Sequence, residues 1–320
     1  MRREIITWSV VLVVILAAFG GTVLILNASL YSASGFVRGY LDSLARHDAE
    51  GALDLAGTTV VGDASDALLV PGAMGDLDEI ALVSDTADEQ GVHTVVYSFS
   101  AGGVPGTSSF RVTHTGELLG LFSTWAFEKN PLGVIQLTVR HDPGFSANGV
   151  ALATPTPDRA SPYLVFAPGT YELSHRSAWL QATSTPVTVT QPGVAVRGSI
   201  DVEANAAFGK EVQKEVNTYL DACATQTVLL PTGCPFGEAM GNRIVSTPAW
   251  TMTSYPRVVI EPGATSGQWV MPATDAVAHL VVEVKSLFDG SISTFDEDVP
   301  FSVSYVITFL PDGGLSIAEQ

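Results

Sequence analysis

The chain has 320 residues, of which 46% are hydrophobic, and it carries a formal net charge of −18. This length predicts two or three domains, and the apolar fraction is large enough to fill their cores, which excludes a largely disordered chain. Because an acidic surface repels phosphate backbones, nucleic acid is excluded as a natural partner.

The first predicted element is an apolar helix over residues 5–26, which contain no charged side chain. At ~1.5 Å per residue such a helix is ~33 Å long, about the thickness of the bilayer hydrocarbon core. Arg2 and Arg3 precede it, and the residues that directly follow it are uncharged. The excess of positive charge predicts a cytoplasmic tip at residues 1–4, a transmembrane helix at 5–26 and an extracytoplasmic remainder.

Two alternatives to a membrane anchor remain open. A cleaved signal peptide also has a basic start and an apolar run, although its apolar core is typically shorter and the candidate cleavage site at Ser32-Ala33-Ser34 is poor. A buried helix of a soluble protein normally keeps a polar face, which this stretch lacks. We therefore favour the anchor.

Residues 34–129 predict a helical hairpin followed by an antiparallel meander. Val37, Tyr40 and Leu44 follow helical spacing, and Asp48 and Gly57 are suited to start and end a second, short helix. Alternating apolar residues then predict strands over 80–86, 93–100, 109–115 and 117–127.

Residues 130–204 predict a small all-β module. Asn130-Pro131 is a boundary signal, and no helical period follows it. Turn sequences such as Pro168-Gly169 and Pro192-Gly193 separate short apolar segments. The predicted strands cover residues 134–139, 150–153, 163–166, 170–175 and 186–198.

Residues 205–320 repeat the order of helix and then sheet. An apolar stripe through Val212, Val216 and Leu220 predicts a helix over 208–226. Extended segments are predicted over 243–255, with a possible interruption at Pro248, and then over 258–261, 276–288, 300–310 and 315–318.

The chain has two cysteines, Cys223 and Cys234. In an exported domain they are expected to form a disulfide, because oxidising compartments favour one and the spacing closes a short loop. The alternative is two unrelated buried thiols. A zinc site needs more ligands than this pair offers, so no metal is predicted.

The segment FVRGYLDSLARHDAEGALDLAG at 36–57 resembles the opening of the NTF2-like superfamily, and EVQKEVNTYLDACATQ at 211–226 is similar. APGTYEL at 167–173 resembles small surface β domains of the PEGA type. The whole arrangement resembles exported proteins of high-GC Gram-positive bacteria, on the segments STWAFEKNPLG at 123–133 and ACATQTVLLPTGCPFG at 222–237. The resemblance implies an α+β protein with two cones, each a curved antiparallel sheet around a helix, separated by the β module.

Members of that superfamily include isomerases, dehydratases, transport factors and non-catalytic modules, so the resemblance fixes no activity. A pocket inside a cone would involve Tyr97, His93, Tyr305 or His279, although none of these has a motif spacing. The tyrosines are expected to be core residues with bonded hydroxyl groups, and the histidines to be ordinary surface or core residues. Asp296, Glu297 and Asp298 are expected to form a solvated loop, because consecutive side chains of an extended chain alternate in direction and do not converge on a metal.

No catalytic motif or cofactor signature is present. The leading hypothesis is therefore a single-pass membrane protein with a non-catalytic binding or scaffolding role in the cell envelope. Its expected partners are the membrane, through the N-terminal helix, and an envelope protein or small apolar ligand. A small-molecule sensor or carrier and an isomerase-like or dehydratase-like enzyme remain alternatives, and a buried Asp with a raised pKa beside a Tyr would indicate the enzyme.

Overall fold

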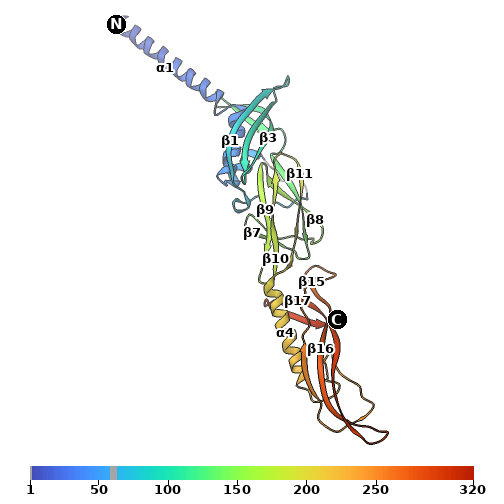
Figure 1. The fold of residues 1–320 in the computed structure, drawn as a ribbon. Helices are drawn as coiled ribbons and strands as arrows, with labels where there is room; N and C mark the ends of the chain where they lie inside the picture. Colours follow the sequence, from blue (N-terminus) through green and yellow to red (C-terminus); the bar gives the residue numbers. More distant parts are fainter. Residues whose placement is uncertain (1, 58–62) are drawn as a thin grey trace. The chain divides into compact units, whose positions relative to one another are not determined.

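The computed structural model describes residues 2–57 and 63–320, and the side chains of residues 2–7 and 10 lie outside that description. The fold is α+β, as predicted, and it divides into two compact units (Figure 1). The first unit comprises Met1–Thr138, Gly144–Ser174 and Ser184–Ile200, and the second comprises Val139–Pro143, His175–Thr183 and Asp201–Gln320.

Helix α1 (Arg2–Ala28) extends beyond the predicted residues 5–26 at both ends. Its window Val11–Ala28 has a mean hydropathy of 2.5, and none of that window is buried in the protein. These properties suit a membrane span, and a signal sequence shares them. The side chains of Arg2 and Arg3 lie outside the described ones, so the predicted cytoplasmic orientation of residues 1–4 stays a prediction.

The predicted helical hairpin is confirmed. Helix α2 (Ala33–Ala45) begins at Ser32, whose hydroxyl accepts a hydrogen bond from the Gly35 amide at 2.9 Å. Helix α3 (Ala49–Ala56) is capped by the Asp48 carboxylate, and it ends at Gly57 in the left-handed conformation with φ of 64°. Both helix ends therefore follow from the local sequence.

A four-stranded antiparallel meander in the order β1-β2-β3-β4 packs against α2. The predicted strand at 117–127 is wrong at its start. Leu119 and Gly120 have positive φ angles of 55° and 65°, so the chain turns there and Glu117 belongs to the preceding strand. The strands are β1 (Leu77–Ala87), β2 (His93–Ala101), β3 (Val104–Leu118) and β4 (Phe122–Phe127).

The next segment is all-β, as predicted, but two details differ. A strand at Gly144–Ala147 was not predicted, and the predicted strand at 186–198 is broken by a turn in which Gly193 has φ of 70°. The strands form two sheets in the orders β12-β10-β9-β6-β7 and β11-β5-β8. They are β5 (Leu132–Arg140), β6 (Gly144–Ala147), β7 (Val150–Ala153), β8 (Ala160–Phe166), β9 (Gly169–Arg176), β10 (Leu180–Val189), β11 (Ala195–Asp201) and β12 (Glu203–Ala204).

Within the first unit, α2 and part of the all-β segment share one core. Leu132, Leu164 and Phe166 belong to the same buried cluster as α2. The buried Tyr40 hydroxyl lies 3.1 Å from the Ala167 carbonyl oxygen, to which it donates a hydrogen bond. The predicted division into domains at 34–129, 130–204 and 205–320 stays a prediction.

The second unit is built on helix α4 (Ala206–Ala224), which is capped by the Asn205 side chain and lies alongside the long strands β16 and β17 (Figure 1). The predicted interruption at Pro248 is confirmed. The predicted strand at 258–261 is reduced to a two-residue strand, and those at 276–288 and 300–310 are parts of much longer strands. The strands are β13 (Arg243–Ile244), β14 (Ala249–Ser254), β15 (Glu261–Pro262), β16 (Gln268–Lys285), β17 (Ile292–Phe309) and β18 (Leu315–Glu319).

The apolar stripe of α4 packs against this sheet. Phe208 is fully buried, with its ring edge-on to Trp269 at 6.1 Å between ring centres. Cys223, near the end of the helix, forms a disulfide with Cys234, with 5.8 Å between the two Cα atoms. The predicted pairing is therefore present.

Candidate functional site

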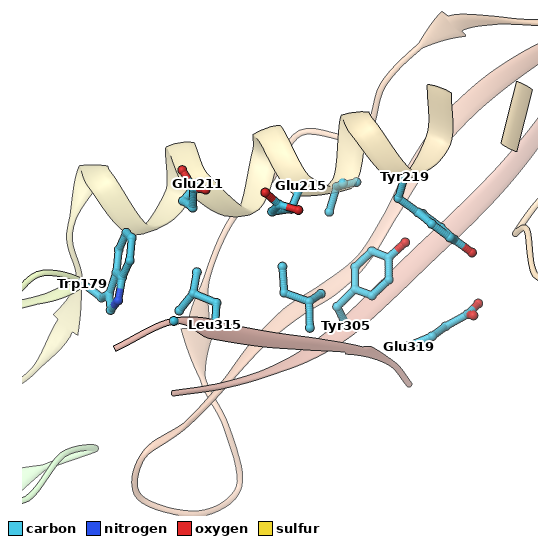
Figure 2. Close-up of a pocket in the computed structure, with 10 residues that line it drawn as sticks. Trp179, Glu211, Glu215, Tyr219, Tyr305, Leu315 and Glu319 are labelled. Atoms are coloured by element: carbon cyan, nitrogen blue, oxygen red, sulfur yellow. The ribbon is translucent and has the colours of Figure 1, made fainter. Parts of the chain in front are cut away.

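A cavity of about 530 Å³ lies inside the second unit, between α4 and the strands β17 and β18 (Figure 2). Its lining combines acidic, aromatic and apolar side chains. They are Trp179, Glu211, Glu215, Val216, Tyr219, Tyr305, Gly314, Leu315, Ile317 and Glu319.

The helical wall of the cavity comes from the residues beside the buried stripe of α4. Glu211, Glu215 and Tyr219 are spaced four residues apart, so they lie in one row along the helix. The ammonium group of Lys214 lies 2.9 Å from the Glu211 carboxylate and 3.7 Å from that of Glu215. Because Lys214 and Glu215 are more than half exposed, this pairing is screened by water and neutralises the acidic row only in part.

The opposite wall is strand β18. Side chains alternate along a strand, so Leu315, Ile317 and Glu319 share one face, and all three line the cavity. Figure 2 shows Leu315 below the helix and Glu319 at the end near the two tyrosines. This wall is therefore apolar along most of its length and acidic at one end.

Tyr305 places an unpaired polar group against the cavity. Its side chain is only 6% exposed, and its hydroxyl has no hydrogen-bond partner among the described residues. Burial, with smaller contributions from Tyr219 and Glu319, raises the pKa of Tyr305 to about 12, so the hydroxyl keeps its proton at neutral pH. A buried hydroxyl without a partner costs free energy, which a ligand acceptor or donor at this position would recover.

Backbone contacts orient the other two aromatic residues. The Trp179 indole N–H donates a 3.0 Å hydrogen bond to the Gly313 carbonyl oxygen. The Tyr219 hydroxyl donates to the Gly233 carbonyl oxygen, which lies within the loop closed by the disulfide. Burial and the nearby Glu319 carboxylate raise the pKa of Tyr219. Both ring positions are thus fixed before any ligand binds.

This set of side chains suits a cationic group on an apolar stem. Carboxylates attract an ammonium or guanidinium ion, and indole and phenol faces stabilise such an ion further. Val216, Leu315 and Ile317 provide apolar contact for the stem. Among the described residues, no basic side chain lines the cavity, so its lining does not favour an anion.

A second cavity, of about 600 Å³, lies in the first unit, but its polar groups bond to one another. The Asn148 amide donates to the carbonyl oxygens of Ala73 and Thr170, at 2.8 and 3.0 Å. The Ser184 hydroxyl donates to the Glu172 carboxylate at 2.6 Å. These groups are already satisfied, so this cavity is the weaker candidate.

Of the four residues predicted for a pocket, the structure places Tyr305 in the candidate site, although its hydroxyl is unpaired where a bonded one was expected. Tyr97 is a core residue as expected, and its hydroxyl donates to the Ser34 carbonyl oxygen at 2.9 Å. His93 lies 2.6 Å from the Asp85 carboxylate, with its ring edge-on to Trp125. These two side chains are engaged within the first unit.

The fourth residue, His279, shows that one prediction was wrong. Asp296, Glu297 and Asp298 lie in strand β17 and do not form a loop, and alternation puts Asp296 and Asp298 on the same face. Both carboxylates converge on His279, each at 2.8 Å from one of its ring nitrogens. The Asp298 hydrogen bond is the largest cause of a raised pKa for His279, and Asp296 adds to it.

No metal was predicted, and the alternative of an isomerase-like or dehydratase-like enzyme called for a buried Asp beside a Tyr. Among residues 2–57 and 63–320, no group of three or more His, Cys, Asp or Glu side chains has an arrangement that could hold a metal ion. The described Asp that contacts a Tyr hydroxyl in the second unit is Asp221, which accepts from Tyr255 at the surface. This exposed pair differs from the buried pair expected for an isomerase-like site.

Compared with known proteins, the chain matches no family model, no curated protein and no solved structure. The resemblance to the NTF2-like superfamily therefore stays a prediction.

Sequence reasoning missed most of the cavity lining. The row of Glu211, Glu215 and Tyr219 at four-residue spacing was a usable signal, since it borders the apolar stripe. Its juxtaposition with Leu315, Ile317 and Glu319 was not visible in the sequence, because it arises from strand pairing nearly a hundred residues further along the chain.

Proposed function

We propose that the protein is a single-pass, membrane-anchored binding protein whose second unit captures a cationic ligand outside the cytoplasm. The observation that carries the binding role is the unpaired, buried hydroxyl of Tyr305 in a cavity bordered by Glu211, Glu215 and Glu319. Its chemistry points to binding and not to turnover, because the carboxylates at this cavity are open to water.

The anchoring role is supported by α1 and by the disulfide. A long, unburied apolar helix is costly in water and favourable in a bilayer. A disulfide is typical of an oxidising compartment. The NTF2-like fold remains part of the proposal for residues 34–129 and 205–320, supported by the order of helix and then curved antiparallel sheet in each.

A hairpin at the end of α1 supports membrane proximity. The Asn27 amide donates a 2.7 Å hydrogen bond to the Leu121 carbonyl oxygen, and its side-chain oxygen accepts from the Ser123 amide at 3.0 Å. The ring of Tyr31 stacks on Phe122. The neighbouring Leu119 is 83% exposed at the tip of this hairpin, so an apolar side chain is held close to the point where α1 ends.

The binding role is tested with the full chain in lipid nanodiscs and hexylammonium as the probe, using saturation-transfer NMR of the probe. Hexylammonium is expected to bind, while hexanol and hexanoate, which match its length but not its charge, bind at least fivefold more weakly. Tyr305→Phe is expected to weaken hexylammonium binding at least threefold without destabilising the fold, because the hydroxyl has no partner to lose.

The matched control is Tyr163→Phe, which removes another buried hydroxyl without a described partner, on a residue of the first unit that does not line the cavity. Equal binding of the three probes, or equal effects of the two substitutions, would contradict the proposed function.

A further inference from the structure

The cavity is bordered by an unpaired sheet edge. Along the described chain, β18 pairs with β17 on one side and with no strand on the other. Edge strands present free N–H and C=O groups, which can pair with a further extended chain. The open edge and the cavity thus belong to the same short strand.

The register identifies which backbone groups are free. In an antiparallel pair, hydrogen-bonded residue pairs alternate with non-bonded ones. The Leu310 amide donates to the Gly314 carbonyl oxygen, and the Gln320 amide donates to that of Ser304. Continuing this alternation through the register places Ser316 and Ala318 in the bonded pairs with β17. The N–H and C=O groups of the remaining residues of β18, namely Leu315, Ile317 and Glu319, therefore point to the open edge.

These same three residues direct their side chains into the cavity. The cavity forms a groove between α4 and β18. A chain added along the edge of β18 lies beside this groove, and alternate side chains of the added chain enter it. Main-chain hydrogen bonds supply affinity in this mode, and the groove supplies side-chain selectivity.

The charged residues of the groove determine which side chains of the added chain can bind there. Glu211 and Glu215 border it along α4, and Glu319 borders it at the end of β18. A lysine or arginine side chain complements these carboxylates, and its aliphatic stem packs on Ile317 or Leu315. A second copy of the chain is a poor occupant, because the same three acidic groups on each copy repel one another and the whole chain carries a net charge of −18.

We propose that an extended peptide segment with alternating basic residues adds to the free edge of β18 as a further strand, with those basic side chains in the groove against α4. This proposal rests on the proposed function and specifies its ligand. The five residues of β18 span about 17 Å, so the segment in contact is about five to seven residues long.

The test measures binding of the peptide acetyl-TKTVTKT-amide to the full chain in nanodiscs by isothermal titration. Strand addition predicts that N-methylation of one alternating set of peptide amides, either all T positions or all K and V positions, weakens binding at least tenfold. Methylation of the other set leaves binding within about twofold, because those amides face away from β18. The sensitive set reports whether the added strand is parallel or antiparallel.

A pair of protein variants checks the same edge. Ile317→Pro removes a free N–H that does not bond to β17, and Ile317→Ala shortens the same side chain but keeps the N–H. Ile317→Pro is expected to weaken peptide binding at least fivefold relative to Ile317→Ala. Far-ultraviolet circular dichroism and the intact disulfide confirm that each variant is folded.

The outcomes separate this inference from the proposed function. If hexylammonium binds but N-methylation of the two sets has equal effects, strand addition is wrong and the proposed function stands. If neither hexylammonium nor the peptide binds, the proposed function is wrong as well. Self-association of the chain that the peptide displaces would identify the occupant as a second copy and would also overturn the inference.

Discussion

The hydroxyl of Tyr219, on helix α4, donates a hydrogen bond to the carbonyl oxygen of Gly233, inside the loop that the Cys223–Cys234 disulfide closes. Gln226 strengthens the same loop, because its side-chain oxygen accepts from the Thr232 amide at 2.8 Å. Tyr219 also lines the candidate cavity. The disulfide loop therefore positions a side chain of the proposed binding site.

This relationship predicts that removal of the disulfide affects both stability and binding. The double substitution of Cys223 and Cys234 by Ser is expected to cost about 2.5–3 kcal/mol of unfolding free energy, from the entropy of closing a loop of about a dozen residues. Hydrogen exchange of α4 amides measures this cost. Hexylammonium binding is expected to weaken, since Tyr219 loses its fixed acceptor.

Tyr219→Phe serves as the comparison, because it removes the hydroxyl but keeps the disulfide. Binding is expected to fall to a similar degree in both variants while stability falls mainly in the double Ser variant. Unchanged binding in the double Ser variant would show that the loop does not position the site.

A second prediction concerns the buried hydroxyl of Tyr40. It donates to the Ala167 carbonyl oxygen at 3.1 Å, and burial raises the pKa of Tyr40 well above its ordinary value. Tyr40→Phe leaves that carbonyl without its partner and is expected to cost about 1–3 kcal/mol in the first unit. Hydrogen exchange of amides in β2 and β8 measures the loss.

The control is again Tyr163→Phe, since the Tyr163 hydroxyl is buried without a described partner. That substitution is expected to be neutral or slightly stabilising. Equal costs for Tyr40→Phe and Tyr163→Phe would contradict the role assigned to the Tyr40 hydrogen bond.

A third prediction concerns the pH dependence of the second unit. Asp298, the largest cause, and Asp296 raise the pKa of His279 above its ordinary value. The neighbouring strand β14 contributes the uncharged Thr251 opposite His279, and Thr253 donates to Asp298 at 3.3 Å. A raised folded-state pKa gives stability that is fully present below the unfolded pKa of ~6.5 and is lost as pH rises through the folded value.

Proton NMR of the His279 ring measures this titration directly. Asp298→Asn is expected to lower the pKa of His279 more than Asp296→Asn does. Glu261→Gln is the control, because Glu261 pairs with Val270 on β16, nine residues from His279 and thus roughly 30 Å along the strand. Equal titration in all of these variants would disprove the convergence of the two carboxylates on His279.

A fourth prediction places the hairpin tip at the membrane surface. Leu119→Cys introduces the only free thiol among described residues, because the native cysteines form a disulfide. A polarity-sensitive fluorophore on this thiol is expected to enter the membrane interface. Its emission maximum in nanodiscs is therefore expected at a shorter wavelength than that of the same fluorophore in detergent-free buffer. Val104→Cys, at an exposed residue at the opposite end of strand β3 in the same unit, is expected to give no such shift.

Identical spectra from the two labelled positions would remove the support that the hairpin gives to the anchor. Asn27→Ala tests the cause, since it deletes both hydrogen bonds to the hairpin. The blue shift at position 119 is expected to decrease in that variant.

The helices were predictable from the sequence because their signals are local. Asp48 and Gly57 provide the start and end of α3 within one short segment, and the apolar spacing of α4 marks its buried face. The sheet was less predictable. The turn at Leu119 and Gly120 depends on left-handed backbone conformations, which the apolar residues of this segment do not predict.

Tyr305 is the one residue of the candidate site that was predicted from the sequence, and its hydroxyl was wrongly expected to have a hydrogen-bond partner. A tyrosine between apolar neighbours has the sequence pattern of a core residue whether or not its hydroxyl has a hydrogen-bond partner. Similarly, the side chains of Asp296 and Asp298 were expected to point away from that of Glu297, and they do. Their contacts with His279 were not predicted, because these depend on the pairing of β17 with β16.

The proposed function depends on α1 holding the second unit outside the cytoplasm, and protease accessibility of a C-terminal epitope on intact cells tests this most directly. We expect the epitope to be digested on intact cells, while the full-length chain fractionates with membranes and contains an oxidised Cys223–Cys234 pair. An epitope that is protected until the cells are lysed, on a soluble chain with both thiols free, would contradict the proposed function.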